Sequence, residues 1–227
     1  MCDRTGESDA KQFSRVDTKL WCWYSNMPLA ELVAMPSHPC FRITDKDIDE
    51  LAARTRDEAL IDAYIRWMER AIELDAMILA ITASFAGVQL GGGIGLLEAD
   101  GMDNYAGNTE LAELRRQDEK VDWRNIHIET LNDCYAAPSY FNARGFVFHL
   151  PAFLIAELND QHQYGFIDRL IAIDRSPDGW RELLSAAQRE AITATLSLIA
   201  EHPEYADQAP DIELAIRRLT DISNTAE

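Results

Sequence analysis

The sequence has few cysteines and no recognisable export signal. Only 4 of the 227 residues are cysteines, and no two of them form a Cys-x-x-Cys pair. This spacing indicates neither a disulfide framework nor a cysteine zinc site. The opening residues, MCDRTGESDAKQF, lack the apolar run after a basic start that a secretory signal needs. We therefore expect a cytoplasmic protein with free thiols.

Positive charge is scarce as well. Lysine and arginine number 21 against 39 aspartates and glutamates, which gives a net charge of −18 and an isoelectric point near 4.6. Such a chain is repelled by nucleic acid phosphates and by anionic membrane surfaces, so we expect it to bind neither. The same charge favours a basic protein partner.

A long hydrophobic run of the membrane-spanning kind is missing. Residues 76–97 carry no charge, but they include five glycines, and no lysine or arginine lies close to either end. A membrane-spanning helix needs sustained apolarity and basic flanks on one side. The pattern instead predicts a buried helix end that stops at Gly87, then a glycine-rich turn and a short strand.

Catalytic and metal-binding motifs are also missing. The run GGGIG at 91–95 has neither the lysine of a phosphate loop nor the spacing of a dinucleotide fingerprint. No two of the 5 histidines have the His-x-x-x-His spacing of a zinc helix, and no serine lies in Gly-x-Ser-x-Gly. Glu98, Asp100 and Asp103 lack the spacing of a calcium loop. We predict no metal and no cofactor, and we lean against an enzyme without excluding one.

What is present is mostly helical periodicity. Apolar residues recur every three to four positions from Thr44 onward, and Thr44 itself is a good N-cap. Ser185 and Gln188 predict a capping box ahead of a helix over 186–201. Residues 1–43, which are first polar and then rich in aromatic residues and prolines, predict an irregular arm.

The expected fold is therefore mainly α. We predict a single compact helical domain over 44–227 behind the arm. Residues 88–97 and 145–149 have the composition of short strands, so a small two-stranded element is an additional option. Pro151 fits the first position of a helix that follows a turn at 142–145.

An acidic segment occupies the middle of the chain. Residues 98–122 contain eight acidic side chains but only three basic ones. We predict that a helix over 110–122 carries part of them and that the segment is a face for a basic partner. Alternatively, Arg115 and Arg116 neutralise these acids internally. The eight candidates for partner binding are Glu98, Asp100, Asp103, Glu110, Glu113, Asp118, Glu119 and Asp122.

His149 is the histidine with the most suggestive surroundings, because it stands between Phe148 and Leu150. It is either a buried, hydrogen-bonded side chain or the general base of a hydrolase-type site. The second role needs a carboxylate partner, and Asp118 or Asp122 are the candidates.

Several strings of residues resemble an uncharacterised bacterial domain family. They are IGLLEADGMDNY, LRRQDEKVDW, GFVFHLPA and SAAQREA, which together cover about residues 90–200. They contain the Asp-x-Tyr, Asp-Glu-x-x-Asp-Trp and Phe-His-Leu-Pro-Ala motifs of that family. The resemblance implies a cytosolic bacterial protein but no activity. It marks the positions Asp103, Tyr105, Arg115, Asp118, Glu119, Asp122, Trp123, His149 and Pro151.

The functional expectation combines acidity with the lack of a catalytic motif. We expect a cytosolic binding protein that neutralises a basic toxin or effector by occlusion, as an immunity protein does, without catalysis of its own. Two alternatives stay open: a structural or regulatory homo-oligomeric module, and a hydrolase-type enzyme that uses His149 with Asp118 or Asp122.

Overall fold

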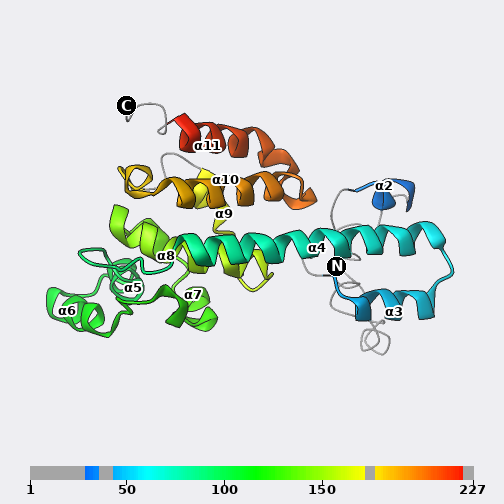
Figure 1. The fold of residues 1–227 in the computed structure, drawn as a ribbon. Coiled ribbons are helices and arrows are strands. Elements are labelled where there is room, and N and C mark those ends of the chain that lie inside the picture. Colours follow the sequence, from blue (N-terminus) through cyan, green and yellow to red (C-terminus); the bar gives the residue numbers. More distant parts are fainter. Residues whose placement is uncertain (1–28, 36–42, 172–176, 222–227) are drawn as a thin grey trace. The chain divides into compact units, whose positions relative to one another are not determined.

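Regular structure in the chain is helical wherever the computed structural model describes it (Figure 1), namely over residues 29–35, 43–171 and 177–221. The mainly α fold is thus confirmed. Most of the predicted arm lies outside these ranges. The chain divides into two compact units, one of Met1–Leu74 with Glu201–Ala206 and one of Asp75–Ala200 with Asp207–Glu227. None of the described helices is both long and apolar enough to span a membrane.

The first unit contains α2 (Leu29–Val33), α3 (Asp45–Arg54) and the first part of α4 (Glu58–Ser84). Thr44 caps α3 as predicted. Its hydroxyl accepts from the N–H of Asp47, and the Asp47 carboxylate accepts from the N–H of Thr44 at 2.8 Å. These two bonds satisfy N–H groups that have no partner within the helix.

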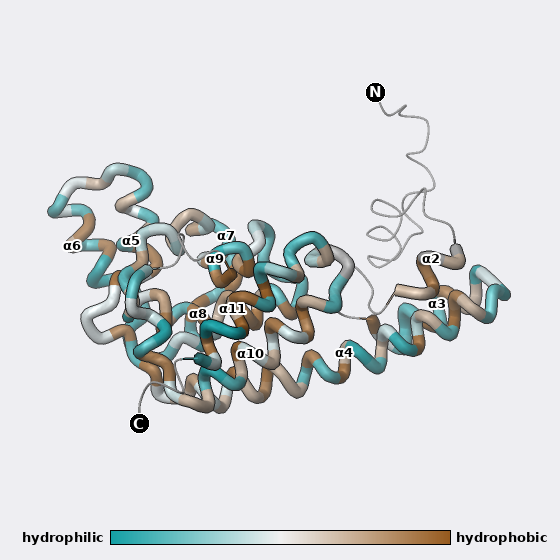
Figure 2. The backbone as a smooth tube through the Cα atoms, turned by 90° about the horizontal axis from the view of Figure 1, so that it is seen from above, coloured by the Kyte–Doolittle hydropathy of each residue, from teal (hydrophilic) through white to brown (hydrophobic). Residues whose placement is uncertain are grey.

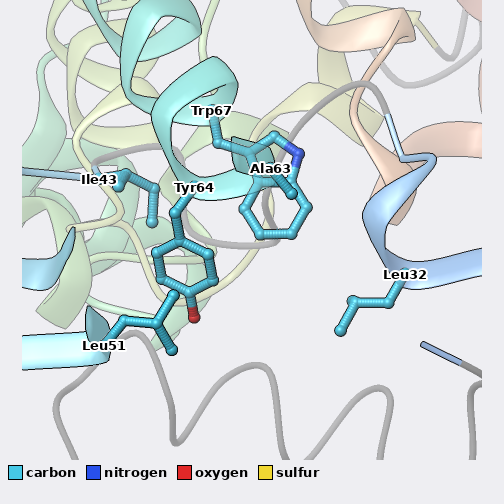
Figure 3. Packing of buried hydrophobic residues seen from close by; sticks show 6 residues of the cluster. All are labelled: Leu32, Ile43, Leu51, Ala63, Tyr64 and Trp67. Carbon is cyan, nitrogen blue, oxygen red and sulfur yellow. The ribbon is translucent and has the colours of Figure 1, made fainter. Parts of the chain in front are cut away.

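A small apolar core holds this unit together (Figure 3). It consists of Leu32, Ile43, Leu51, Ala63, Tyr64 and Trp67. Two side chains of α4 also bind the end of α2: the Trp67 indole N–H donates to Met35 O at 3.1 Å, and Arg66 donates to Val33 O at 2.6 Å. Along α4 as a whole, hydrophobic and hydrophilic residues alternate (Figure 2), which is the pattern of a helix with one buried face.

The second unit contains the remaining helices and short 3₁₀ turns. In chain order these are α5 (Leu96–Asp103), α6 (Asn108–Gln117), η2 (Trp123–Asn125), α7 (Ile128–Asp133), η3 (Ala137–Ser139), α8 (Ala143–Leu158), α9 (Ile167–Ile171), η5 (Arg181–Leu183), α10 (Ala186–Ala200) and α11 (Ala209–Asp221). The segment η6 (Pro203–Gln208) joins the last two helices along the chain, and its residues 203–206 belong to the first unit. Helices α5 and α6 lie side by side, and so do α10 and α11 (Figure 1). The predicted capping box of Ser185 and Gln188 starts α10.

Helix α8 forms the core of the second unit, and nearly all of its residues are buried. Its Phe146 ring lies 4.9 Å from Trp180 and 5.8 Å from Phe166, between ring centroids. Phe153 stacks on the same Phe166 at 4.5 Å. These contacts connect α8 with the segments before α9 and η5, so burial of aromatic surface is the main stabilising contribution here.

The predicted turn at 142–145, strand at 145–149 and helix start at Pro151 are wrong. All of these residues except Asn142 lie within α8, and Asn142 is its N-cap. A proline inside a helix removes one backbone hydrogen bond and costs about 3 kcal/mol. Helix α8 is apolar on all sides, and its burial offsets this cost. The local sequence pattern around Pro151 did not reveal that the whole helix is buried.

The other half of the optional strand pair does not form either. Leu90–Gly93 make a tight turn in which Gly93 N donates to Leu90 O at 2.8 Å, and Gly91 has a positive φ of 55°. Helix α5 then begins at Leu96. The helix expected over 110–122 is also displaced, because it starts at Asn108 and ends at Gln117. Gly87, with φ 78°, does follow the end of α4 as predicted.

Candidate functional site

Asn142 fixes the glycine-rich loop of residues 90–95 against α8. Its side-chain oxygen accepts from Gly145 N at 2.9 Å, which caps α8, and from Ile94 N at 3.1 Å. Its amide group donates to Gly92 O at 3.2 Å. One side chain therefore starts a helix and holds a loop that lies about fifty residues earlier in the chain.

Asp118 performs the corresponding task for α5. Its two carboxylate oxygens accept from Leu97 N at 2.7 Å and from Glu98 N at 3.2 Å. Gly95, the N-cap of α5, has no side chain that could do this. Burial raises the pKa of Asp118, and the two N–H donors act in the opposite direction. This candidate for partner binding is a capping group in the interior.

Glu98 is buried as well, and Arg115 compensates its charge. The Arg115 Nε donates to one carboxylate oxygen at 2.8 Å, and Nη2 binds the other oxygen. The Glu98 side chain is 4% exposed, whereas that of Arg115 is 62% exposed. A two-point contact of this kind fixes orientation as well as charge. It joins α5 to α6.

The remaining motif acids also bind within their own segment. Glu119 accepts from the backbone N–H groups of Lys120, Val121 and Asp122, and these bonds lower its pKa. Asp122 binds Arg124, which lowers the pKa of Asp122. The same turn is anchored by its neighbour: the buried Trp123 indole donates to Phe85 O at 3.0 Å.

Helices α5 and α6 carry the other acids of the segment. Tyr140 donates its hydroxyl to Asp103 at 2.8 Å, and Asn104 donates to Asp100 at 3.0 Å. Glu113 pairs with Arg116 on the surface, and Glu110 is exposed. Most of the acidic groups of residues 98–122 are thus bound to groups within the protein.

His149 is the buried, hydrogen-bonded histidine of the two alternatives. It is 1% exposed, and its Nδ1 lies 2.7 Å from Gly145 O. Since a carbonyl only accepts, Nδ1 carries the proton. The ring stacks on Phe141 at 4.4 Å, and burial lowers its pKa to about 4. Among the described contacts, His149 hydrogen bonds to neither Asp118 nor Asp122, whose carboxylates accept from the N-terminus of α5 and from Arg124.

Two motif positions have special backbone roles. Tyr105 has a positive φ of 58° directly after α5, and its side chain is 95% exposed. Pro151 lies inside α8, as described above.

A surface that the sequence analysis did not identify lies on α7 and the segment 161–164. It surrounds an open pocket of about 400 Å³. The lining residues are Ile128, Glu129, Asn132, Asp133, Gln161, Gln163 and Tyr164. Asn132 connects the two segments, since it donates to Gln161 O at 2.9 Å and accepts from Gln163 N at 3.0 Å.

Two tyrosines adjoin this pocket. Tyr135 and Tyr164 stack with ring centroids 4.5 Å apart, and each is 54% exposed. We call the pocket residues together with Tyr135 the acidic tyrosine surface. Its members come from segments about thirty residues apart, one of them irregular, so no periodic sequence pattern marks them.

Comparison with known proteins gives a family but no activity. A sequence model of a family of unknown function (DUF6714) matches residues 73–219. The chain belongs to this family. The expected membership of an uncharacterised domain family is thereby confirmed, and every motif position that the resemblance marked falls within the match. No curated protein and no solved structure matches the chain.

DUF6714 is a family of unknown function, so membership by itself assigns no activity to the chain. Within the described residues, no three histidine, cysteine, aspartate or glutamate side chains are grouped so that they could hold a metal ion. Among the pockets of the described residues, one on the acidic tyrosine surface is bordered by carboxylates and one at the glycine-rich loop is bordered by cations.

Proposed function

We propose that the chain is a binding protein for a basic protein partner and has no catalysis of its own. The observation that carries the proposal is the acidic tyrosine surface. Two exposed carboxylates, Glu129 and Asp133, border its pocket, and neither makes an ion pair within the described part of the chain. Unpaired carboxylates beside exposed aromatic rings suit a cationic side chain.

The chemistry of this surface matches arginine and lysine. Carboxylates accept charge-assisted hydrogen bonds from both side chains. The faces of Tyr135 and Tyr164 attract cations, and their flat area is covered when a partner docks. Asn132 is already held by two hydrogen bonds, so this part of the surface is ordered before the partner arrives.

The proposed contact area differs from the acidic segment as a whole. Glu98 and Asp118 are buried and serve the interior. Asp100 and Asp103 are partly exposed; the pKa of Asp100 is raised mainly by burial and further by the charges of Asp103 and Asp133. These groups extend the negative potential from the acidic tyrosine surface toward α5.

For the partner we propose a basic toxin or effector whose cationic site is covered in the complex. The net charge of −18 supports this, since complementary charge speeds association and rejects wrong partners. Occlusion needs a fixed surface rather than a reactive group, which agrees with the buried position of His149. A cytoplasmic location is part of this proposal.

The test is an affinity purification from the native host with three forms of the chain. They are the wild type, E129Q/D133N in the acidic tyrosine surface, and E110Q/E113Q on α6, which removes the same charge elsewhere. We expect a basic protein in stoichiometric amount with the wild type and with E110Q/E113Q, and its loss with E129Q/D133N. Equal recovery with all three forms, or recovery of the chain alone as a homo-oligomer, would overturn the proposal.

A further inference from the structure

The glycine-rich loop borders a second pocket, which has the opposite charge. This pocket has a volume of about 310 Å³. Its lining residues are Leu90, Gly91, Gly92, Gly93, Ile94, Arg115, Lys120 and Asn142. Arg144 also reaches it, because its Nη1 lies 3.6 Å from the point where a Cβ on Gly91 would be. Three cationic side chains thus meet at one place in a chain with only 21 basic residues.

Two of these cations form no ion pair with a carboxylate of the described residues, although the charge of Lys120 acts on Asp118. The Lys120 ammonium donates to Arg116 O and Asp118 O, each at 3.2 Å, and keeps a third N–H group. Arg144 is exposed on the first turn of α8 and makes no ion pair with any described residue. Arg115 is bound to Glu98 through Nε and Nη2, which leaves its Nη1 group.

The backbone of the loop adds uncharged donors. The N–H groups of Gly91 and Gly92 donate to no group among the described residues, whereas those of Leu90, Gly93 and Ile94 are all bonded. Gly91 has φ 55°, a conformation that glycine adopts without the steric strain that other residues would have. Successive free N–H groups in a turn of this kind form a concave site for anions.

The carboxylates nearby are occupied. Glu98 binds Arg115, Asp118 binds the N-terminus of α5, and Glu119 binds the turn over 120–122. The oxygens of these carboxylates therefore accept from groups of the protein. The side chains of Lys120 and Arg144 and the free N–H groups of the loop hydrogen bond to no carboxylate among the described residues. A ligand with several acceptor oxygens would give these donors hydrogen-bond partners.

We propose that this pocket binds a phosphate group, either as free phosphate or as a phosphate monoester. A phosphate group offers oxygens in three directions, to an ammonium, a guanidinium and backbone N–H groups at once. A carboxylate offers two oxygens in one plane and would leave part of the donors unused. The site lies apart from the acidic tyrosine surface in its lining residues, and the inference does not rest on the proposed binding function.

The test uses the whole chain, with inorganic phosphate, glycerol phosphate and acetate as probes at constant ionic strength. Binding is followed by isothermal titration and by the amide resonances of the glycines. We expect saturable binding of phosphate or of glycerol phosphate, with the largest shifts at Gly91 and Gly92, and none with acetate. Preference for the free ion or for the monoester distinguishes the two sources of the group.

Variants decide whether the site is the one described. R144Q removes an exposed cation at the pocket, and we expect it to weaken phosphate binding about tenfold. R116Q, an exposed arginine on α6 that does not line the pocket, is the matched control and should bind as the wild type does. K120M removes a second cation of the pocket and should also weaken phosphate binding, which tests the site independently if R144Q is less stable than the wild type. Equal binding by R144Q and R116Q, or the absence of saturable phosphate binding to the wild type, would overturn the proposal.

Discussion

Gly95 lies so close to Asp118 that a Cβ on Gly95 would be 2.1 Å from the Asp118 carboxyl carbon. The backbone of Gly95 is ordinary, with φ −79°, so the requirement is for space and not for conformation. The absence of a side chain lets the carboxylate reach the N–H groups at the start of α5. A glycine in the loop and an acid 23 residues later thus form one capping unit.

We predict that G95A destabilises the protein, because the methyl group displaces the Asp118 carboxylate from α5. Forcing extra volume into a packed position costs about 1–3 kcal/mol. Gly92 is the matched control in the same loop, since a Cβ there meets nothing within 4 Å. G92A should change the free energy of unfolding by less than about 0.5 kcal/mol. Urea unfolding of both variants measures this, and equal values would contradict it.

Glu98 and Arg115 give a second prediction about stability. R115M leaves the buried Glu98 carboxylate without its cation, which is unfavourable in a poorly solvated position. We therefore expect R115M to lower Tm more than R116M does, because Arg116 pairs with Glu113 on the surface. Adding E98Q to R115M should restore part of the loss. A double variant less stable than R115M alone would contradict the pairing.

The interior position of His149 makes stability depend on pH. Its pKa in the folded chain is about 4, against 6.5 for an unperturbed histidine. Between these two pH values the unfolded chain binds more protons than the folded chain does. The free energy of unfolding therefore rises as the pH increases from 4 to 6.5, and it receives no further increase from His149 above pH 6.5. Across this pH range, the titration of His149 changes the free energy of unfolding by about 3 kcal/mol.

The measurement compares unfolding of the wild type and H149Q between pH 4 and pH 7. Gln keeps a hydrogen-bond donor but does not titrate, so H149Q should lose less stability on acidification than the wild type does. H127Q, at an exposed histidine, controls for the loss of a histidine as such. Identical pH dependence in H149Q and the wild type would contradict the buried, neutral assignment.

These residues also show where sequence reasoning succeeds. Thr44 and Ser185 were predicted as helix starts and are confirmed, because a cap depends on residues three positions apart. The alternative that arginine neutralises the acidic segment internally agrees with the contacts of Arg115 and Arg116. In each case the interaction is local or joins neighbouring helices.

The failures have a physical cause in common. Asn142 and Pro151 read locally as a turn and a helix start, but burial of α8 from all sides overrides both signals. Asp118 was expected within a helix over 110–122, yet α6 ends at Gln117 and Asp118 turns inward to cap α5. The stack of Tyr135 on Tyr164 depends on two segments meeting in space, which spacing along the chain does not reveal.

Cys134 provides a prediction of chemical reactivity. It is buried, and burial together with the charges of Asp100 and Asp133 raises its pKa to about 12. At pH 8 about one molecule in ten thousand then carries the reactive thiolate. We expect iodoacetamide to leave Cys134 unmodified in the folded chain and to alkylate it in guanidinium, as mass spectrometry of its peptide would detect. Alkylation at the same rate in both conditions would contradict this.

The proposed partner complex should respond to salt through Glu129 and Asp133. Exposed charges that steer association are screened, so raising the salt from about 0.05 M to 0.5 M should slow association about tenfold or more. E129Q/D133N should associate more slowly at low salt and show a weaker salt dependence, whereas E110Q/E113Q should resemble the wild type.

Tyr164 should affect the complex in a different way. Y164A removes an uncharged contact that is covered after docking, so we expect dissociation to become about tenfold faster while the salt dependence of association is unchanged. Surface plasmon resonance with the captured partner separates the two rates. If Y164A instead changed only the association rate, or if E129Q/D133N changed only dissociation, the tyrosine pair and the carboxylates would not have the separate roles of anchor and steering charge. If neither variant changed either rate, the contact area would lie elsewhere on the chain.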